Sequence, residues 1–264
     1  MIFYDSALNF SKFFPEIGEE IWYYPVLERA MALSIKLIKK FPNRANGRII
    51  WASELTQAKG RFQRKWFASK GGLWFSLSIF DEFLSTTQSF IPLSVGLALI
   101  KAIHRFGVKE AKLKWINDIH LNGRKLAGVL IEKWKDWYII GIGVNVNNPL
   151  PFFLPAISLK QIFKKEVSIL KCFALIIYFL QHYFGFLRFY ERRCLAEESI
   201  PNLIIKEFKL YSDTLGRCVY FNYDTEKEDG IFGLVIDIGE KGELILKTSN
   251  GISKFTAGEI IYVF

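Results

Sequence analysis

A tight turn flanked by apolar runs constrains the fold of this chain more than any other feature. Short strands are expected at 112–116, 119–121 and 124–133, and Asn122-Gly123 separates the last two. Asn-Gly between apolar runs is the strongest short-range signal for a β-hairpin, because both central residues of such a turn need a positive φ. Another apolar run at 137–146 follows. The sequence therefore predicts a strand, a tight turn and a strand, with one more strand after them.

The rest of the body alternates helical and strand patterns. Helices are expected where apolar residues recur at helical spacing, and strands where short apolar or alternating runs occur. The expected elements are a helix at 26–41, a strand at 48–53, a loop at 55–71, a strand at 73–80, a helix at 92–106 and two helices within 159–195. This mixture predicts an α+β body.

The pattern of apolar and polar residues in the sequence changes after about residue 207. Short β-rich runs occur at 217–223, 231–238, 243–248 and 252–255, separated by glycines and charged turns. Short strands spaced about ten residues apart are typical of a small barrel. The sequence therefore predicts a body at 1–206 and a small all-β unit at 207–264.

Composition narrows the class of protein. The 264 residues are 51% hydrophobic with a formal net charge of +9, which allows a substantial core and excludes a disordered chain. No zinc-finger spacing or aromatic RNA-binding signature accompanies the basic charge, which is therefore read as a lysine-rich surface. Three widely spaced cysteines indicate a reducing cytoplasm, and neither they nor the histidines have metal-ligand spacing. The apolar stretch 172–180 is too short to span a bilayer.

Two cationic segments point to the ligand. Lys125 lies just past the predicted turn, and Gly128 follows three residues later, where a ligand could approach the backbone. The segment 59–66 reads KGRFQRKW and lies in the predicted loop. Two basic segments around one pocket favour an anionic, phosphate-bearing ligand.

Several motifs resemble those of biotin protein ligases. The segment 114–132, KWINDIHLNGRKLAGVLIE, is very similar to the family's lysine-and-glycine motif, with Ile116 in place of a proline. The segment 141–147, GIGVNVN, matches a second motif, and 156–159, AISL, is similar to a third. Glycines of the tail, including those around Gly258-Glu259-Ile260, resemble the family's C-terminal SH3-like barrel.

The resemblance implies a fold and an activity. It implies a class II synthetase-like mixed sheet flanked by helices, with a small C-terminal SH3-like β-barrel. The implied enzyme uses ATP and Mg²⁺ to convert biotin to biotinyl-AMP, and transfers biotin to a lysine of a biotin carboxyl carrier domain. A cytoplasmic ligase-only form is expected, with no DNA-binding module and no membrane partner. A homodimer remains open.

Site residues follow from the same resemblance. Lys125 would be the catalytic lysine at the carboxyl and the α-phosphate, with Arg61 as a second catalytic cation. The residues implied for ATP and the acyl-adenylate are Lys59, Gly60, Arg64, Trp66, Lys114, Asn117, Asp118, Gly128 and Asn145. Fixed cations of this kind can offset the repulsion between a carboxylate and a phosphate. No metal ligands from the protein are expected.

The acid-binding positions depart from the family pattern. Leu55 replaces a glutamine that contacts the biotin head group, and Arg29-Ala30-Met31 stand where the family has a Ser-Thr-Asn or Ser-Thr-Met run. Buried polar groups of a urea ring would cost about 1–3 kcal/mol each if left unpaired. Biotin remains the first expectation. A lipoyl or fatty acid, or a catalytically weak regulatory protein, remains an alternative.

Overall fold

A mixed seven-stranded sheet forms the body of the molecule in this computed structural model, which describes residues 10, 14, 16–198, 202–223 and 230–263. Its strands lie in the order β1-β2-β3-β7-β6-β5-β4. They are β1 Ile21–Leu27, β2 Ile49–Leu55, β3 Leu73–Phe80, β4 Lys112–Lys114, β5 Asp118–Leu121, β6 Arg124–Trp134 and β7 Trp137–Val144. Only β1 and β2 pair in parallel, and the other neighbours are antiparallel.

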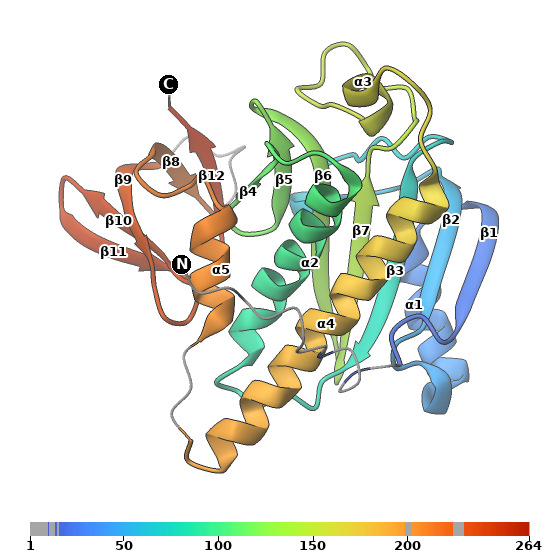
Figure 1. Cartoon of the computed structure of the whole chain (residues 1–264), viewed down its shortest axis with the longest axis horizontal. Helices are drawn as coiled ribbons and strands as arrows, with labels where there is room; N and C mark the ends of the chain where they lie inside the picture. The colour runs from blue at the N-terminus through green and yellow to red at the C-terminus, as the bar shows by residue number, and fades with distance from the viewer. Residues whose placement is uncertain (1–9, 11–13, 15, 199–201, 224–229, 264) are drawn as a thin grey trace.

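Helices cover both faces of this sheet (Figure 1). The helices are α1 Ala30–Lys40, α2 Ile91–Phe106, α3 Leu159–Phe163, α4 Ile169–Leu195 and α5 Leu203–Tyr211, and short 3-10 turns occur at Pro42–Arg44, Arg61–Gln63 and Gln88–Phe90. Ile140 and Val144 of β7 belong to the same buried cluster as α2 and α4. On the opposite face, Ile139 packs with Met31 of α1. The two faces of β7 therefore bury different cores, as the alternation of a strand requires.

The predicted hairpin is confirmed between β5 and β6. Leu121 pairs with Arg124, and the turn residues Asn122 and Gly123 have φ values of 50° and 74°. The register then shifts, because His120 opposes Lys125 while Ile119 opposes Ala127. One extra residue in β6 is therefore a β-bulge directly after the turn.

The predicted helix at 26–41 began too early. Val26 and Leu27 belong to β1, where they pair with Glu54 and Leu55 of β2, and the helix begins at Ala30. Their apolar side chains fit both patterns, so tertiary pairing with β2 decides between helix and strand. Neither β1 nor α5 was expected from the sequence. The division of 159–195 into two helices is confirmed by α3 and α4.

The C-terminal strands form a second sheet, which confirms a small β unit but not a closed barrel. Its strands are β8 Cys218–Asn222, β9 Ile231–Ile238, β10 Leu244–Thr248, β11 Gly251–Phe255 and β12 Glu259–Tyr262, in the order β11-β10-β9-β8-β12. Within the described residues β11 and β12 are the two edges and do not pair, so the sheet is open. The predicted small C-terminal β unit is therefore confirmed, although its sheet does not close into a barrel within the described residues. The last strand, β12, was not predicted.

Two helical segments, Gln88–Phe106 and Ile169–Leu195, are long and apolar enough to cross a membrane by length and composition. The sequence-based view that 172–180 is too short to span therefore underestimated this helix, which has 27 residues. Both segments also pack into the core beside the sheet (Figure 1). The core helices of compact domains have the same composition.

Candidate active site

One cavity of about 430 Å³ opens on the face of the sheet that also carries α1. Its walls come from β6 and β7, the loop after β2, the start of α1 and the last strand, β12. Every site residue expected from the sequence lies on it. These are Arg29, Ala30, Met31, Leu55, Lys59, Gly60, Arg61, Arg64, Trp66, Lys114, Asn117, Asp118, Lys125, Gly128 and Asn145. Segments far apart in the chain are thus brought to one place.

Lys125 lies over Gly128 because of the bulge in β6. In a regular strand, residues three apart point to opposite faces. Here a Cβ added to Gly128 would lie 2.8 Å from Cε and 3.1 Å from Nζ of Lys125, so both residues face the cavity. The Lys125 ammonium pairs with Asp118 Oδ2 at 2.7 Å and lies 5.2 Å from the centre of the Trp66 ring. The glycine therefore makes room for the lysine itself.

Hydrogen bonds to the backbone hold this lysine in place. Asn145 donates from Nδ2 to the Lys125 carbonyl at 3.2 Å, and Asn148 in turn donates to Asn145 Oδ1 at 3.1 Å. The backbone N–H of Lys125 donates to the Pro155 carbonyl at 2.8 Å. Asn117 is buried and donates to the Val129 carbonyl at 2.7 Å. The amide side chains therefore position the strands that carry the cations.

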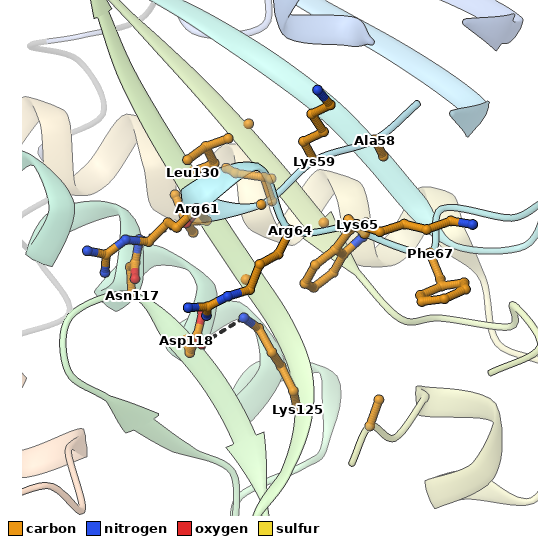
Figure 2. A pocket seen from close by; sticks show the side chains of 18 of the residues that line it. Ala58, Lys59, Arg61, Arg64, Lys65, Phe67, Asn117, Asp118, Lys125 and Leu130 are labelled. Carbon is orange, nitrogen blue, oxygen red and sulfur yellow. Dashed lines mark hydrogen bonds and ion pairs between the residues drawn. The ribbon is translucent and has the colours of Figure 1, made fainter. Parts of the chain in front are cut away.

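The basic loop faces Lys125 across the cavity. Figure 2 shows Arg61 and Arg64 directed toward Asn117 and Asp118, while Lys59 points away. Lys59 donates to Gln63 Oε1 at 2.9 Å. Of the predicted phosphate-binding cations, Lys59 is therefore placed least favourably, although it lies on the cavity wall.

The two arginines are anchored by the C-terminal sheet. Arg64 Nη1 lies 2.6 Å from Glu259 Oε2, and Arg61 donates from Nη1 to the Gly258 carbonyl at 2.6 Å. Arg61 Nε is also 3.9 Å from Glu259 Oε1. The C-terminal sheet thus supplies a wall of the cavity and the acidic partner of the loop.

Burial shifts the pKa values of two of these cationic side chains. Desolvation lowers the pKa of the Lys114 ammonium and of the Arg61 guanidinium, because burial disfavours their charged forms. Asp118 opposes that effect at both sites by raising the pKa. An anionic ligand would do the same. The cavity therefore has desolvated positive charge available for a phosphate.

A buried donor in the cavity also lacks a partner. Nε1 of Trp66 makes no hydrogen bond to any described residue, and an unpaired buried donor costs about 1–3 kcal/mol. The Trp66 ring lies against Gly143, where an added Cβ would lie 2.9 Å from it.

The opposite end of the cavity is apolar. Ala30, Met31 and Leu55 line it, and Met31 Sδ lies 2.6 Å from the position of a Cβ added to Gly141. Leu55 packs with Ala58 and Trp74. Arg29 is the charged residue of the lining here, and it pairs with Glu132 at 3.6 Å. The cavity therefore has a cationic end and an apolar end.

Sequence reasoning did not assign roles to three residues that shape the cavity. Gly141 and Gly143 leave the surface of β7 open for Met31 and Trp66, and Glu259 holds the arginines. The two segments that contain these residues stood out as motifs in the sequence. The segment 141–147 carries two glycines two residues apart, and the other segment reads Gly258-Glu259-Ile260. Glycines at every second position of a strand leave one face of that strand without side chains. This pattern could have identified Gly141 and Gly143 from the sequence.

An apolar groove that ends among lysines and arginines suits an amphiphilic acid beside a nucleotide, the ligand pair of an acid-activating ligase. The sequence model of the Biotin/lipoate A/B protein ligase family matches residues 35–147, and that of the Biotin protein ligase C terminal domain matches residues 214–262. The chain belongs to the biotin protein ligase family, as these two matches and the relatives below show.

Curated relatives and solved structures agree with this assignment. The chain is 26% identical over 275 aligned positions to the bifunctional ligase/repressor BirA of Bacillus subtilis, covering 97% of this chain and 78% of that protein. It is 29% identical over 108 positions to the biotin–[acetyl-CoA-carboxylase] ligase of Mycobacterium tuberculosis, covering 39% of this chain and 40% of that protein. The biotin protein ligase of Aquifex aeolicus, solved with biotin and ATP, superposes with a TM-score of 0.76 at 24% identity, over 93% of this chain and 99% of that one.

Proposed function

We propose that this protein activates biotin with ATP to biotinyl-AMP and transfers the biotinyl group to a lysine of a carrier protein. The observation that carries the proposal is Lys125, held by Asp118 above Gly128 and facing Arg61 and Arg64 across one cavity. Family membership supports the same reaction, since the superposed Aquifex protein binds biotin and ATP.

The proposed chemistry has two steps. A carboxylate oxygen of biotin attacks the α-phosphorus of ATP, the bond to the bridging oxygen breaks, and pyrophosphate leaves. The amine of the acceptor lysine then attacks the acyl carbon, AMP leaves with the bonding electrons, and the amine loses a proton. Lys125 would contact both the carboxyl and the α-phosphate and offset their repulsion. Arg61, Arg64 and Lys114 would hold the phosphates.

The cavity fits a magnesium ion that enters with the nucleotide. Among the described residues, no group of three or more His, Cys, Asp or Glu side chains could hold a metal ion. Mg²⁺ is commonly bound through substrate phosphates and one or two carboxylates. Asp118 and Glu259 are the carboxylates on this cavity, and Asp118 lies among the cations. Mg²⁺ would neutralise phosphate charge there.

The remaining expectations stay predictions. We expect a cytoplasmic enzyme with a catalytic unit at 1–206 and a C-terminal unit at 207–264. Its acceptor would be the lysine of a biotin carboxyl carrier domain, with neither DNA nor a membrane as a partner. Whether it forms a homodimer is open to measurement of its mass in solution.

An ATP–pyrophosphate exchange assay with a panel of acids tests the proposal. Biotin should support exchange, and purified carrier domain should then become biotinylated. A second candidate is favoured by the apolar side chains of Ala30 and Leu55, which suit an alkyl chain better than a urea ring. Exchange with lipoate or octanoate but not with biotin would establish that candidate. ATP binding without exchange for any acid would indicate a catalytically inactive regulatory protein.

A further inference from the structure

A network of polar side chains joins the C-terminal sheet to the hairpin of β4 and β5, which lie side by side (Figure 1). Its centre is Asp213, in the connection between α5 and β8. Asp213 Oδ1 accepts a hydrogen bond from His120 Nε2 at 3.0 Å and another from the Tyr262 hydroxyl at 2.7 Å. His120 belongs to β5 and Tyr262 to β12. None of the three residues lines the cavity, so any effect on a ligand must pass through their neighbours.

The hydrogen bonds of this network have a fixed direction. The backbone N–H of Trp115 donates to Thr214 Oγ1 at 3.0 Å, and Thr214 Oγ1 lies 3.0 Å from the Tyr262 hydroxyl oxygen. An ionised carboxylate can only accept, so Tyr262 donates to Asp213 and the Thr214 hydroxyl donates to Tyr262. Each hydroxyl group thus receives one hydrogen bond and gives one. Removal of either hydroxyl would leave a neighbour without its partner.

The protonation states agree with this direction. Burial raises the pKa of Tyr262, so its hydroxyl keeps its proton at neutral pH. Burial alone would also raise the pKa of Asp213, but the hydrogen bonds from His120 and Tyr262 lower it below its ordinary value. Asp213 is therefore a carboxylate at neutral pH, and Nε2 of His120 carries the proton that lies between the two side chains.

The network fixes β4 on both sides of Lys114, one of the cations that line the cavity. The backbone N–H of Asp213 donates to the Leu113 carbonyl at 3.2 Å, and the N–H of Trp115 bonds to the same connection. The residues before and after Lys114 are therefore both held. The Lys114 ammonium also lies 5.0 Å from the centre of the Tyr262 ring, within the range of a cation–π attraction.

The network also fixes the strand that carries Glu259. β12 has four residues, with Glu259 at its start and Tyr262 at its end, and it is an edge of the C-terminal sheet. Its ladder is with β8, so the Tyr262 hydroxyl gives this short strand a second attachment, to the catalytic sheet. Glu259 in turn pairs with Arg61 and Arg64 of the basic loop. The arginines therefore depend on the placement of β12.

We propose that this network positions the cations that would hold the phosphates of ATP. We call it the Asp213 network, and its members are His120, Asp213, Thr214 and Tyr262. It acts on Lys114 through β4, and on the two arginines through Glu259. This inference rests on the proposed function and assigns positioning residues to its nucleotide half. The apolar end of the cavity is built from β2 and α1, which the network does not contact, so its loss should weaken the binding of ATP but not of the acid.

Tyr262→Phe tests the proposal, because it removes one hydroxyl and keeps the ring beside Lys114. Calorimetric titration with ATP and Mg²⁺ gives the Kd for the nucleotide, and ATP–pyrophosphate exchange gives the KM for each substrate. The Kd and the KM for ATP should rise about tenfold, because misplaced cations meet the phosphates with poorer geometry. The KM for biotin should stay within about twofold.

A pair of variants at His120 separates the hydrogen bond from the bulk of the side chain. His120→Leu removes the donor to Asp213 and should raise the Kd for ATP by several-fold. His120→Gln places an amide N–H where Nε2 lies and should keep the Kd near the wild-type value. This pair gives the same comparison if Tyr262→Phe fails to fold.

The matched control is Tyr183→Phe. It also removes a tyrosine hydroxyl bonded to a carboxylate, that of Glu207, but between α4 and α5 and outside the cavity lining. It should lower the thermal stability and leave both KM values unchanged. A merely structural role for the Asp213 network would give the same result in Tyr262→Phe.

Two results would overturn the proposal. One is an unchanged Kd for ATP in folded Tyr262→Phe or His120→Leu, and the other is an equal rise in the KM for ATP and for biotin. A wild type that binds ATP but shows no exchange with biotin would refute the proposed function alone, and the Kd values of the variants would still decide the role of the network. A wild type that does not bind ATP would overturn both.

Discussion

The two ends of the cavity are built in different ways. At the cationic end, Lys125 is fixed by Asp118, by the amide of Asn145 and by backbone bonds, and the arginines are fixed by Glu259. At the apolar end, one ion pair between Arg29 and Glu132 supplies the charged contact. Groups that stabilise a transition state must be held in place before the reaction, whereas a binding contact can be exchanged with less loss. The chemistry is therefore more tightly specified than the acid.

The largest effect is expected from Lys125→Ala. Loss of the ammonium between carboxylate and α-phosphate should lower the rate of exchange by about 100- to 1000-fold, the usual cost of removing one preorganised donor. The KM for biotin should change much less. The matched control is Lys160→Ala, whose ammonium makes an exposed pair with Glu166. Exchange at the wild-type rate in Lys125→Ala would refute the catalytic role.

Gly128→Ala should give the next largest effect. The new Cβ would meet Lys125 Cε at 2.8 Å and Asp118 Oδ1 at 3.2 Å, so the ammonium must move. A displacement of about 1 Å from the reacting geometry can reduce the rate by about 100-fold. Gly230→Ala is the control, because its Cβ would make ordinary contacts of at least 3.5 Å in the C-terminal sheet. Equal exchange rates in the two variants would show that the room at Gly128 is not needed.

At the apolar end, Leu55→Gln should improve biotin binding. A glutamine amide adds both a donor and an acceptor beside Ala30, and one net hydrogen bond of about 1 kcal/mol corresponds to a KM about fivefold lower. Leu55→Met, which adds no hydrogen-bonding amide, should leave the KM near the wild-type value. If Leu55→Gln and Leu55→Met behave alike in the exchange assay, the head group does not reach this position.

The smallest expected effect is the uptake of a fraction of a proton by Lys114 when the nucleotide binds. Burial lowers the pKa of Lys114 below its ordinary 10.5, and a bound phosphate favours the charged ammonium and raises that pKa. At pH values between the lowered pKa and 10.5, ATP binding should therefore take up a fraction of a proton. The uptake should vanish at pH values well below the lowered pKa, where Lys114 is charged with or without ligand. Calorimetry in buffers of different ionisation heat measures it, and Lys114→Gln should abolish it. Equal uptake in that variant would assign the proton to another group.

Sequence reasoning succeeded where signals are local. The turn at Asn122-Gly123 requires positive φ at both residues, so the hairpin was predictable. The residues named from the family resemblance lie on one cavity, and their roles in binding and catalysis stay predictions. The bulge after the turn was not predictable, because it depends on the pairing of His120 with Lys125 across two strands. That bulge is why a lysine and a glycine three residues apart face the same ligand.

Contacts between residues far apart in the sequence explain the features that were not predicted correctly. Val26 and Leu27 look equally suited to a helix, and only their ladder with β2 makes them a strand. The role of Glu259 depends on docking of the C-terminal sheet against the loop, which neither segment encodes alone. The barrel expected from the strand spacing is an open sheet, since the spacing gives the number of strands but not whether the edges meet.

The contact between Arg64 and Glu259 joins residues 195 positions apart in the chain. During synthesis the basic loop leaves the ribosome well before its acidic counterpart, which follows 195 residues later. Until Glu259 docks, the arginines lack the ion pair that it supplies. Closing so long a loop also adds entropy cost that only the docked sheet offsets. The nucleotide end of the cavity is therefore completed only after the segment that carries Glu259 has been synthesised and has docked against the basic loop.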